Sequence, residues 1–168
     1  MVCDFSVHTL KRYTRPIFDL YGVLALVDSG AGYLILDFDD DSITTLFGGI
    51  KIKYTVEITG VSQQKVQGNV FILDHFVLGD MVFRHIPAIQ APIADSDISI
   101  ILGCCMFGGG ASCTYDTGKD MVLFHYPDIC VAAAKTWTKH NGEWRILDVQ
   151  DNHFVALPIS ETLDISDC

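Results

Sequence analysis

The stretch that decides how this chain folds is Val23-Leu24-Ala25-Leu26-Val27-Asp28-Ser29-Gly30-Ala31. An apolar run here ends on one carboxylate and passes directly into a tight Ser-Gly-Ala turn. An apolar strand seldom ends on Asp unless the turn or a chemical reaction requires that side chain. Further along, Ile100-Ile101-Leu102-Gly103 is a second apolar run, and it stops at a glycine. The two segments predict two buried strands that each lead into a short turn.

Short strands separated by turn signals are expected on both sides of these segments. Residues 17–27 form a nearly continuous apolar run, which is typical of one strand buried on both faces. Residues 50–58 alternate between apolar and polar side chains, which indicates a half-exposed strand. Residues 66–73 are the predicted antiparallel partner of that strand. The pattern therefore predicts an all-β, barrel-like domain.

One helix and two more hairpins complete the prediction for this domain. Asp39-Asp40-Asp41-Ser42 can cap a short helix over residues 43–47, which ends at Gly48-Gly49. Residues 76–86 are expected to form a hairpin around Gly79-Asp80, closed by Pro87. Residues 112–126 are expected to form the last hairpin, with its turn at Asp116-Thr117-Gly118-Lys119.

The sequence changes character after Pro127, and a C-terminal β extension is predicted there. Asn141-Gly142 lies between two segments that each carry a tryptophan, and Asn-Gly in this setting is a strong hairpin signal. Residues 153–159 can add one more strand. The predicted domains are therefore residues 1–126 and residues 127–168, the second being a dimerisation element or a cover over a cleft.

Composition and charge narrow the expected partners. The chain has 168 residues, of which 49% are hydrophobic, and its mean hydropathy is +0.32. This excess predicts an apolar surface that a second copy of the chain covers. The formal charge of −10 disfavours nucleic acid and anionic membranes as partners. No apolar run is long enough to span a bilayer and no signal peptide is visible, so a cytoplasmic location is expected.

Cysteine and histidine residues carry no recognisable metal or redox motif. None of the six cysteines falls in a C-x-x-C pair, so buried free thiols are predicted rather than disulfides. The six histidines show no metal-ligand spacing. We therefore expect no metal site and no cofactor.

Together, Asp28-Ser29-Gly30-Ala31 and Ile101-Leu102-Gly103 resemble the two hallmark motifs of the retropepsin-like aspartic proteases. The resemblance covers about residues 15–126 and implies a closed all-β barrel with a flap hairpin. It implies that Asp28 is catalytic and that Ser29, Gly30 and Ala31 shape the loop around it. Ile101, Leu102 and Gly103 would support that loop. The hairpin tip at Gly60, Val61, Ser62 and Gln63 lies where the family carries its flap, which closes over an extended peptide.

The resemblance implies hydrolysis of peptide bonds by two aspartates that share one proton. One carboxylate activates water as a base, and the other donates a hydrogen bond to the substrate carbonyl. A chain with one such motif cannot supply both acids, so two copies must meet across a two-fold axis. The expected function is an aspartic endopeptidase that acts as a homodimer on an extended peptide or protein, with an Asp28 dyad.

Two other classes of function remain open. The same fold could dimerise and bind an extended peptide without cutting it. The sequence of the hairpin tip favours this alternative, because many relatives carry a glycine-rich tip and this chain reads Gly-Val-Ser-Gln-Gln over residues 60–64. A redox or metal protein that uses its cysteines is a third, weaker reading. Asp116-Thr117-Gly118 also matches the family triplet, but no apolar strand precedes it, so an ordinary turn is predicted.

Overall fold

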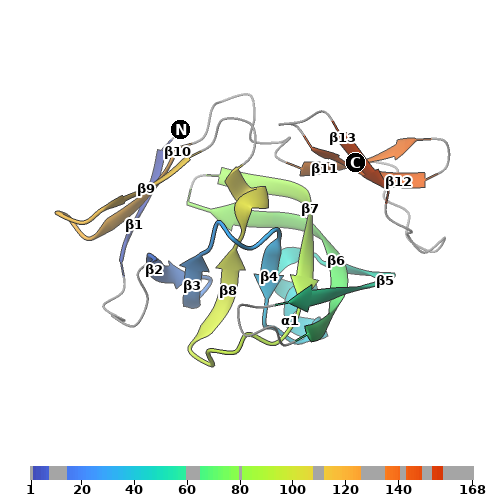
Figure 1. Ribbon diagram of the computed structural model, residues 1–168, viewed down its shortest axis with the longest axis horizontal. Helices are drawn as coiled ribbons and strands as arrows, with labels where there is room; N and C mark the ends of the chain where they lie inside the picture. Colours follow the sequence, from blue (N-terminus) through green and yellow to red (C-terminus); the bar gives the residue numbers. More distant parts are fainter. Residues whose placement is uncertain are drawn as a thin grey trace.

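The computed structural model describes residues 2–7, 15–59, 65–79, 81–107, 112–125, 135–140, 143–148 and 153–156. Its largest sheet contains β2 (Ile17–Leu20), β3 (Val23–Val27), β4 (Leu34–Leu36), β5 (Ile50–Thr59), β6 (Lys65–Leu78), β7 (Met81–Gln90) and β8 (Ile98–Leu102). These strands pair in the order β2-β3-β8-β4-β7-β6-β5 and curl into a half-barrel (Figure 1). The predicted all-β fold class is confirmed.

Two three-stranded sheets accompany the half-barrel. One pairs β1 (Val2–Ser6), β10 (Met121–His125) and β9 (Ser112–Asp116), in that order. The other pairs β11 (Lys135–His140), β12 (Glu143–Asp148) and β13 (His153–Ala156). The helical elements are α1 (Asp40–Phe47) and the 3-10 turn η1 (Cys104–Phe107). None of the helices in the described ranges is long and apolar enough to cross a membrane.

The hairpin predicted around Asn141-Gly142 is confirmed. β11 and β12 pair antiparallel, and His140 lies opposite Glu143 in the register. The third strand of this sheet, β13, covers His153–Ala156 of the predicted residues 153–159, and residues 157–159 lie outside the described ones. The predicted division into two domains stays a prediction.

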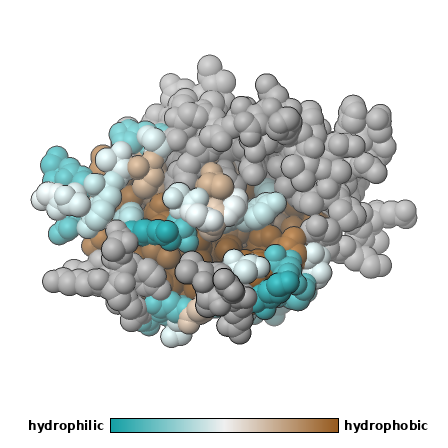
Figure 2. Space-filling model, viewed as in Figure 1, coloured by the Kyte–Doolittle hydropathy of each residue, from teal (hydrophilic) through white to brown (hydrophobic). Residues whose placement is uncertain are grey.

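The main hydrophobic core lies inside the half-barrel and continues to the small N-terminal sheet. The ring centroid of Phe18 on β2 is 4.6 Å from the ring centroid of Phe5 on β1 and 5.5 Å from that of Phe124 on β10. Phe18 and Phe124 are fully buried, so this aromatic cluster joins the two sheets. Figure 2 shows hydrophobic residues across the middle of one face of the molecule. The large hydrophobic side chains exposed in the described part are Leu46, Ile50, Val82 and Tyr115.

The segment predicted as one strand over residues 17–27 is instead the hairpin β2–β3, so that prediction was wrong. Leu20 lies opposite Val23 in the antiparallel register. Tyr21 and Gly22 form the turn with φ values of 54° and 74°, as a two-residue turn between twisted strands requires. The hydroxyl of Tyr21 accepts a hydrogen bond of 2.7 Å from the Val77 N–H. Its ring lies 4.7 Å from that of Phe47, so tertiary contacts stabilise a turn residue that the apolar pattern concealed.

The two strands predicted at residues 66–73 and 76–78 form one continuous strand, β6, and β7 continues through Pro87. Asp74 does not end β6 because its side chain faces solvent. Pro87 lies opposite Ile72 in the register. β4 pairs with β7 only from Ala88 onward, so β4 requires no hydrogen bond from Pro87, which has no N–H group.

The prediction of buried free thiols is only partly correct. Cys104 and Cys113 are free, but Cys104 is exposed because it begins η1 at the surface. Cys113 is half-buried, and this burial raises the pKa of its thiol to about 11. A thiol with such a pKa is protonated at neutral pH and reacts poorly, which argues against redox chemistry at Cys113.

Helix α1 has the predicted end, but it begins at Asp40 rather than at residue 43, with Asp39 as its cap. The side chain of Asp39 accepts a 2.7 Å hydrogen bond from the Ser42 N–H, and Gly48 ends the helix with a φ of 59°. The backbone hydrogen bond from Ser42 lowers the pKa of Asp39. Because the carboxylate form makes the cap, its stabilising effect is present at neutral pH and is lost as the pH falls through the lowered pKa.

We expect Asp39→Ala to lower the melting temperature at pH 7, because the Ser42 N–H loses its acceptor. Asp39→Asn should lower it less, since the amide oxygen can still accept this hydrogen bond. The difference between wild type and Asp39→Ala should shrink as the pH is lowered through and below about 4, the ordinary pKa of an aspartate carboxyl, because the pKa of Asp39 is lowered from that value. Thermal unfolding followed by circular dichroism from pH 2 to pH 7 measures this. A pH-independent difference would show that the cap contributes nothing through its charge.

Candidate active site

Asp28 lies at the point where two parallel strands end together. β3 and β8 pair in parallel, with Val27 beside Leu102 in the register. The Asp28 N–H continues this pairing by donating a 3.0 Å hydrogen bond to the Leu102 carbonyl. Because the two parallel strands run in the same direction, their carboxyl ends meet at one edge of the sheet. The structure thus brings both sequence motifs to one place.

The loop after Asp28 is held by its own backbone. The Gly30 N–H donates a 2.9 Å hydrogen bond to Oδ1 of Asp28, and the Ala31 N–H donates one of 3.1 Å to the Asp28 carbonyl. These contacts fix the direction of the carboxylate. The Asp28 side chain is 23% exposed, so it can still reach a molecule outside the chain. Ser29 beside it is exposed.

Gly103 packs against the far side of this loop. A Cβ atom built on Gly103 would lie 2.2 Å from the carbonyl oxygen of Tyr33 and 2.7 Å from that of Ala31. Only glycine lets the two backbones approach this closely. The Cys104 N–H adds a 2.7 Å hydrogen bond to the Ala31 carbonyl. Leu102 is fully buried next to this contact, so the end of β8 supports the Asp28 loop through backbone contact and core packing.

Arg15 is a site residue that the sequence analysis missed. Its Nη1 atom lies 2.7 Å from Oδ1 of Asp28. The hairpin β2–β3 explains this contact, because the Val27 N–H donates to the Pro16 carbonyl at 3.2 Å and thereby places the two ends of the hairpin together. A single strand over residues 17–27 would separate its ends by about 35 Å. The sequence signal for this turn was Tyr21-Gly22 within the apolar run. A turn there would have indicated that Arg15 lies near Asp28.

The predicted flap residues Gly60, Val61, Ser62 and Gln63 lie outside the described residues. The strands that lead to them do form the predicted antiparallel pair, which extends to Thr59 opposite Lys65. Lys65 also forms a 3.0 Å ion pair with Glu57. The structure thus contains the two strands of a long hairpin and does not test which residues form a flap.

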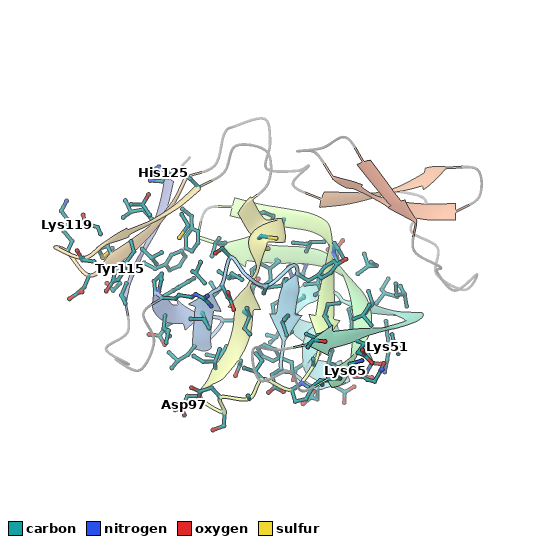
Figure 3. All side chains as sticks on the ribbon, in the orientation of Figure 1. Lys51, Lys65, Asp97, Tyr115, Lys119 and His125 are labelled. Carbon is teal, nitrogen blue, oxygen red and sulfur yellow. The ribbon has the colours of Figure 1, made fainter. Side chains whose placement is uncertain are left out.

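The second Asp-Thr-Gly triplet is the predicted turn. Oδ1 of Asp116 accepts hydrogen bonds from the N–H groups of Gly118 at 3.0 Å and Lys119 at 3.2 Å. β9 and β10 pair around this turn, with Asp116 opposite Met121. Figure 3 shows Tyr115 and Lys119 on this hairpin, at the opposite end of the molecule from Lys51 and Lys65. The carboxylate of Asp116 thus stabilises a hairpin turn.

One histidine, His75, serves local structure. His75 lies between the Asp74 carboxylate, at 3.1 Å from Nδ1, and the Leu46 carbonyl, at 3.0 Å from Nε2. Within the described ranges, no three His, Cys, Asp or Glu side chains are grouped as metal ligands would be.

Comparisons with known proteins give a limited result. No protein-family model matches the chain, and no curated protein matches it. Among solved structures, the chain is similar to a retropepsin-like aspartic protease from Rickettsia conorii, with a TM-score of 0.45 and 21% sequence identity. The match covers 75% of this chain and 91% of that protein. This is a similarity at the level of the fold.

Proposed function

We propose that this chain is an aspartic endopeptidase whose active site forms when two copies bring their Asp28 carboxylates together. The observation that carries the proposal is the geometry of the Asp28 loop. Its carboxylate is oriented by the Gly30 N–H, at 2.9 Å, and the loop rests on Gly103 with no room for a side chain. A turn that needed only an aspartate would not require a second strand end packed against its backbone.

The second copy follows from the chemistry. In the described residues, the Asp28 loop contains one carboxylate, and hydrolysis of a peptide by this route needs two. A two-fold axis next to Asp28 would supply the second, and the exposed Ser29 hydroxyl could hydrogen-bond across that axis.

The proposed reaction needs no covalent intermediate. The ionised Asp28 removes a proton from water while the water oxygen attacks the peptide carbonyl carbon. The protonated Asp28 of the other subunit donates to the carbonyl oxygen, which gives a tetrahedral diol. The diol then collapses: the C–N bond breaks, the amine takes up the proton held by one Asp28, and a diol hydroxyl gives its proton to the other Asp28 as the carboxylic acid product forms. The pair recovers its single shared proton.

Cleavage of a diverse peptide library near pH 5 and near pH 7, by wild type and by Asp28→Asn, tests this proposal. We expect cleavage by the wild type alone, at common subsite preferences in the two conditions. Specific activity should rise with protein concentration, because the active species is a dimer. Equal cleavage by both proteins would assign the activity to another site and overturn the proposal.

A peptide-binding module without catalytic activity is the second candidate, and the Arg15 contact favours it. A guanidinium at 2.7 Å from Asp28 occupies the side chain that the reaction requires to be free. If wild type and Asp28→Asn bind the same library peptides with equal affinity, and neither cleaves them, the chain is a binding module. Fluorescence polarisation of labelled library peptides measures that binding.

A further inference from the structure

The contact between Arg15 and Asp28 has a consequence for assembly. Nη1 of Arg15 is 2.7 Å from Oδ1 of Asp28, and the same oxygen accepts the Gly30 N–H at 2.9 Å. The side of the carboxylate toward Arg15 is therefore occupied. The contact forms within one chain, since the hairpin β2–β3 brings its two ends together through the Val27 to Pro16 hydrogen bond of 3.2 Å.

We propose that Arg15 is a latch that holds Asp28 in the separated subunit and must release it when two subunits assemble the dyad. This inference rests on the proposed function, because it assumes that two Asp28 side chains meet. It adds that the separated subunit is held inactive by an ion pair. Assembly and activation would then be a single exchange of partners at Asp28, from a guanidinium to a second carboxylate.

Arg15 and the Asp28 of a second subunit cannot both bind the same Asp28 carboxylate. A working dyad carries one proton on two carboxylates, and its net charge is −1. Oδ1 of Asp28 already accepts the Gly30 N–H, so a guanidinium on the same oxygen takes the position from which that oxygen would share a proton with the second carboxylate. A bound Arg15 in each subunit would also place two positive charges near the two-fold axis, where like charges repel each other.

Release of Arg15 is feasible because the ion pair is open to water. The Arg15 side chain is 51% exposed and that of Asp28 is 23% exposed. Ion pairs of this kind stabilise weakly and are screened by salt. One such pair changes an equilibrium by up to about fivefold, and two are opened for each dimer, so about a tenfold effect on the dimer dissociation constant is expected.

The test compares Arg15→Gln with Lys51→Gln by sedimentation of the full chain at low salt. Lys51→Gln is a matched control, because this substitution also removes one positive charge and one exposed ion pair, the 3.2 Å contact of Lys51 with Asp40. Lys51 lies on β5, at the opposite edge of the half-barrel from β2 and β3 (Figure 3). We expect Arg15→Gln to dimerise about tenfold more tightly than Lys51→Gln, and this difference to shrink at high salt. Arg15→Lys should behave like the wild type.

A double-mutant cycle with Asp28→Asn identifies the partner of Arg15 without any proteolysis readout. In the Asp28→Asn background the latch has no charge to hold, so Arg15→Gln and Lys51→Gln should dimerise equally. Equal or weaker dimerisation of Arg15→Gln in the original background would overturn the latch. So would a chain that stays monomeric in all variants, which would overturn the proposed function as well.

Cleavage assays on the same samples separate the two proposals. Wild type that cleaves peptides, with no coupling between Arg15 and Asp28 in dimerisation, leaves the proposed function and overturns the latch. Coupling in dimerisation without cleavage by any variant supports the partner exchange at Asp28 and overturns the endopeptidase. Both effects together support both proposals.

Discussion

Asp28→Asn is expected to reduce the rate of peptide cleavage by about a thousandfold or more while the fold stays intact. The amide cannot take a proton from water, and a dyad with two amides has no proton to share. The fold should persist because the Asn side-chain oxygen can still accept the Gly30 N–H, which lies 2.9 Å from Oδ1 in the wild type. Loss of the exposed ion pair with Arg15 should change the free energy of unfolding by about 1 kcal/mol or less.

Mixing the two proteins provides a control that a contaminating protease cannot reproduce. When equal amounts of wild type and Asp28→Asn exchange subunits, random pairing leaves about a quarter of the dimers with two wild-type subunits. Activity should therefore fall well below half of the wild-type value at the same total concentration. Activity that stays at half after exchange would show that each subunit works alone, which contradicts an Asp28 dyad.

The proximity of Gly103 to the Asp28 loop was implied by the resemblance of the two motifs to a known family, whereas local signals predicted only that each apolar run ends at a turn. Each run stops at a turn-forming residue, and a small residue at the end of the second run allows close approach. In the parallel register Val27 lies beside Leu102, so the residues that follow them, Asp28 and Gly103, are also neighbours. The existence and the end of helix α1 were predictable from local signals around Asp39 and Gly48, although the helix begins three residues before the predicted start.

The contact of Arg15 with Asp28 was missed, because it depends on a turn whose local signal is a single glycine, Gly22, inside an apolar run. Tyr21 has a positive φ of 54°, which is unusual for an aromatic residue. Its conformation is stabilised by the hydrogen bond to Val77 and by packing on Phe47, both distant in the sequence. Apolar periodicity cannot distinguish one long strand from a hairpin whose turn residue is itself apolar.

Gly103→Ala is expected to destabilise the domain by about 3 kcal/mol and to abolish peptide cleavage. The new Cβ would lie 2.2 Å from the Tyr33 carbonyl oxygen, 2.7 Å from the Ala31 carbonyl oxygen and 2.8 Å from the Tyr33 nitrogen. These are backbone atoms, so no side-chain rotation can relieve the overlap. The Asp28 loop has to move away from β8, which breaks the Cys104 to Ala31 hydrogen bond of 2.7 Å and shifts the carboxylate.

Gly32→Ala is the matched control for this prediction, because it places the same methyl group in the same loop. A Cβ atom on Gly32 would meet nothing within 4 Å, and its φ is not in the left-handed region. We therefore expect Gly32→Ala to melt within a few degrees of the wild type, whereas Gly103→Ala should melt about 10 °C lower. Thermal unfolding and library cleavage measured on the same samples decide the matter. If Gly103→Ala keeps both its melting temperature and its activity, β8 does not support the Asp28 loop in the way the structure describes.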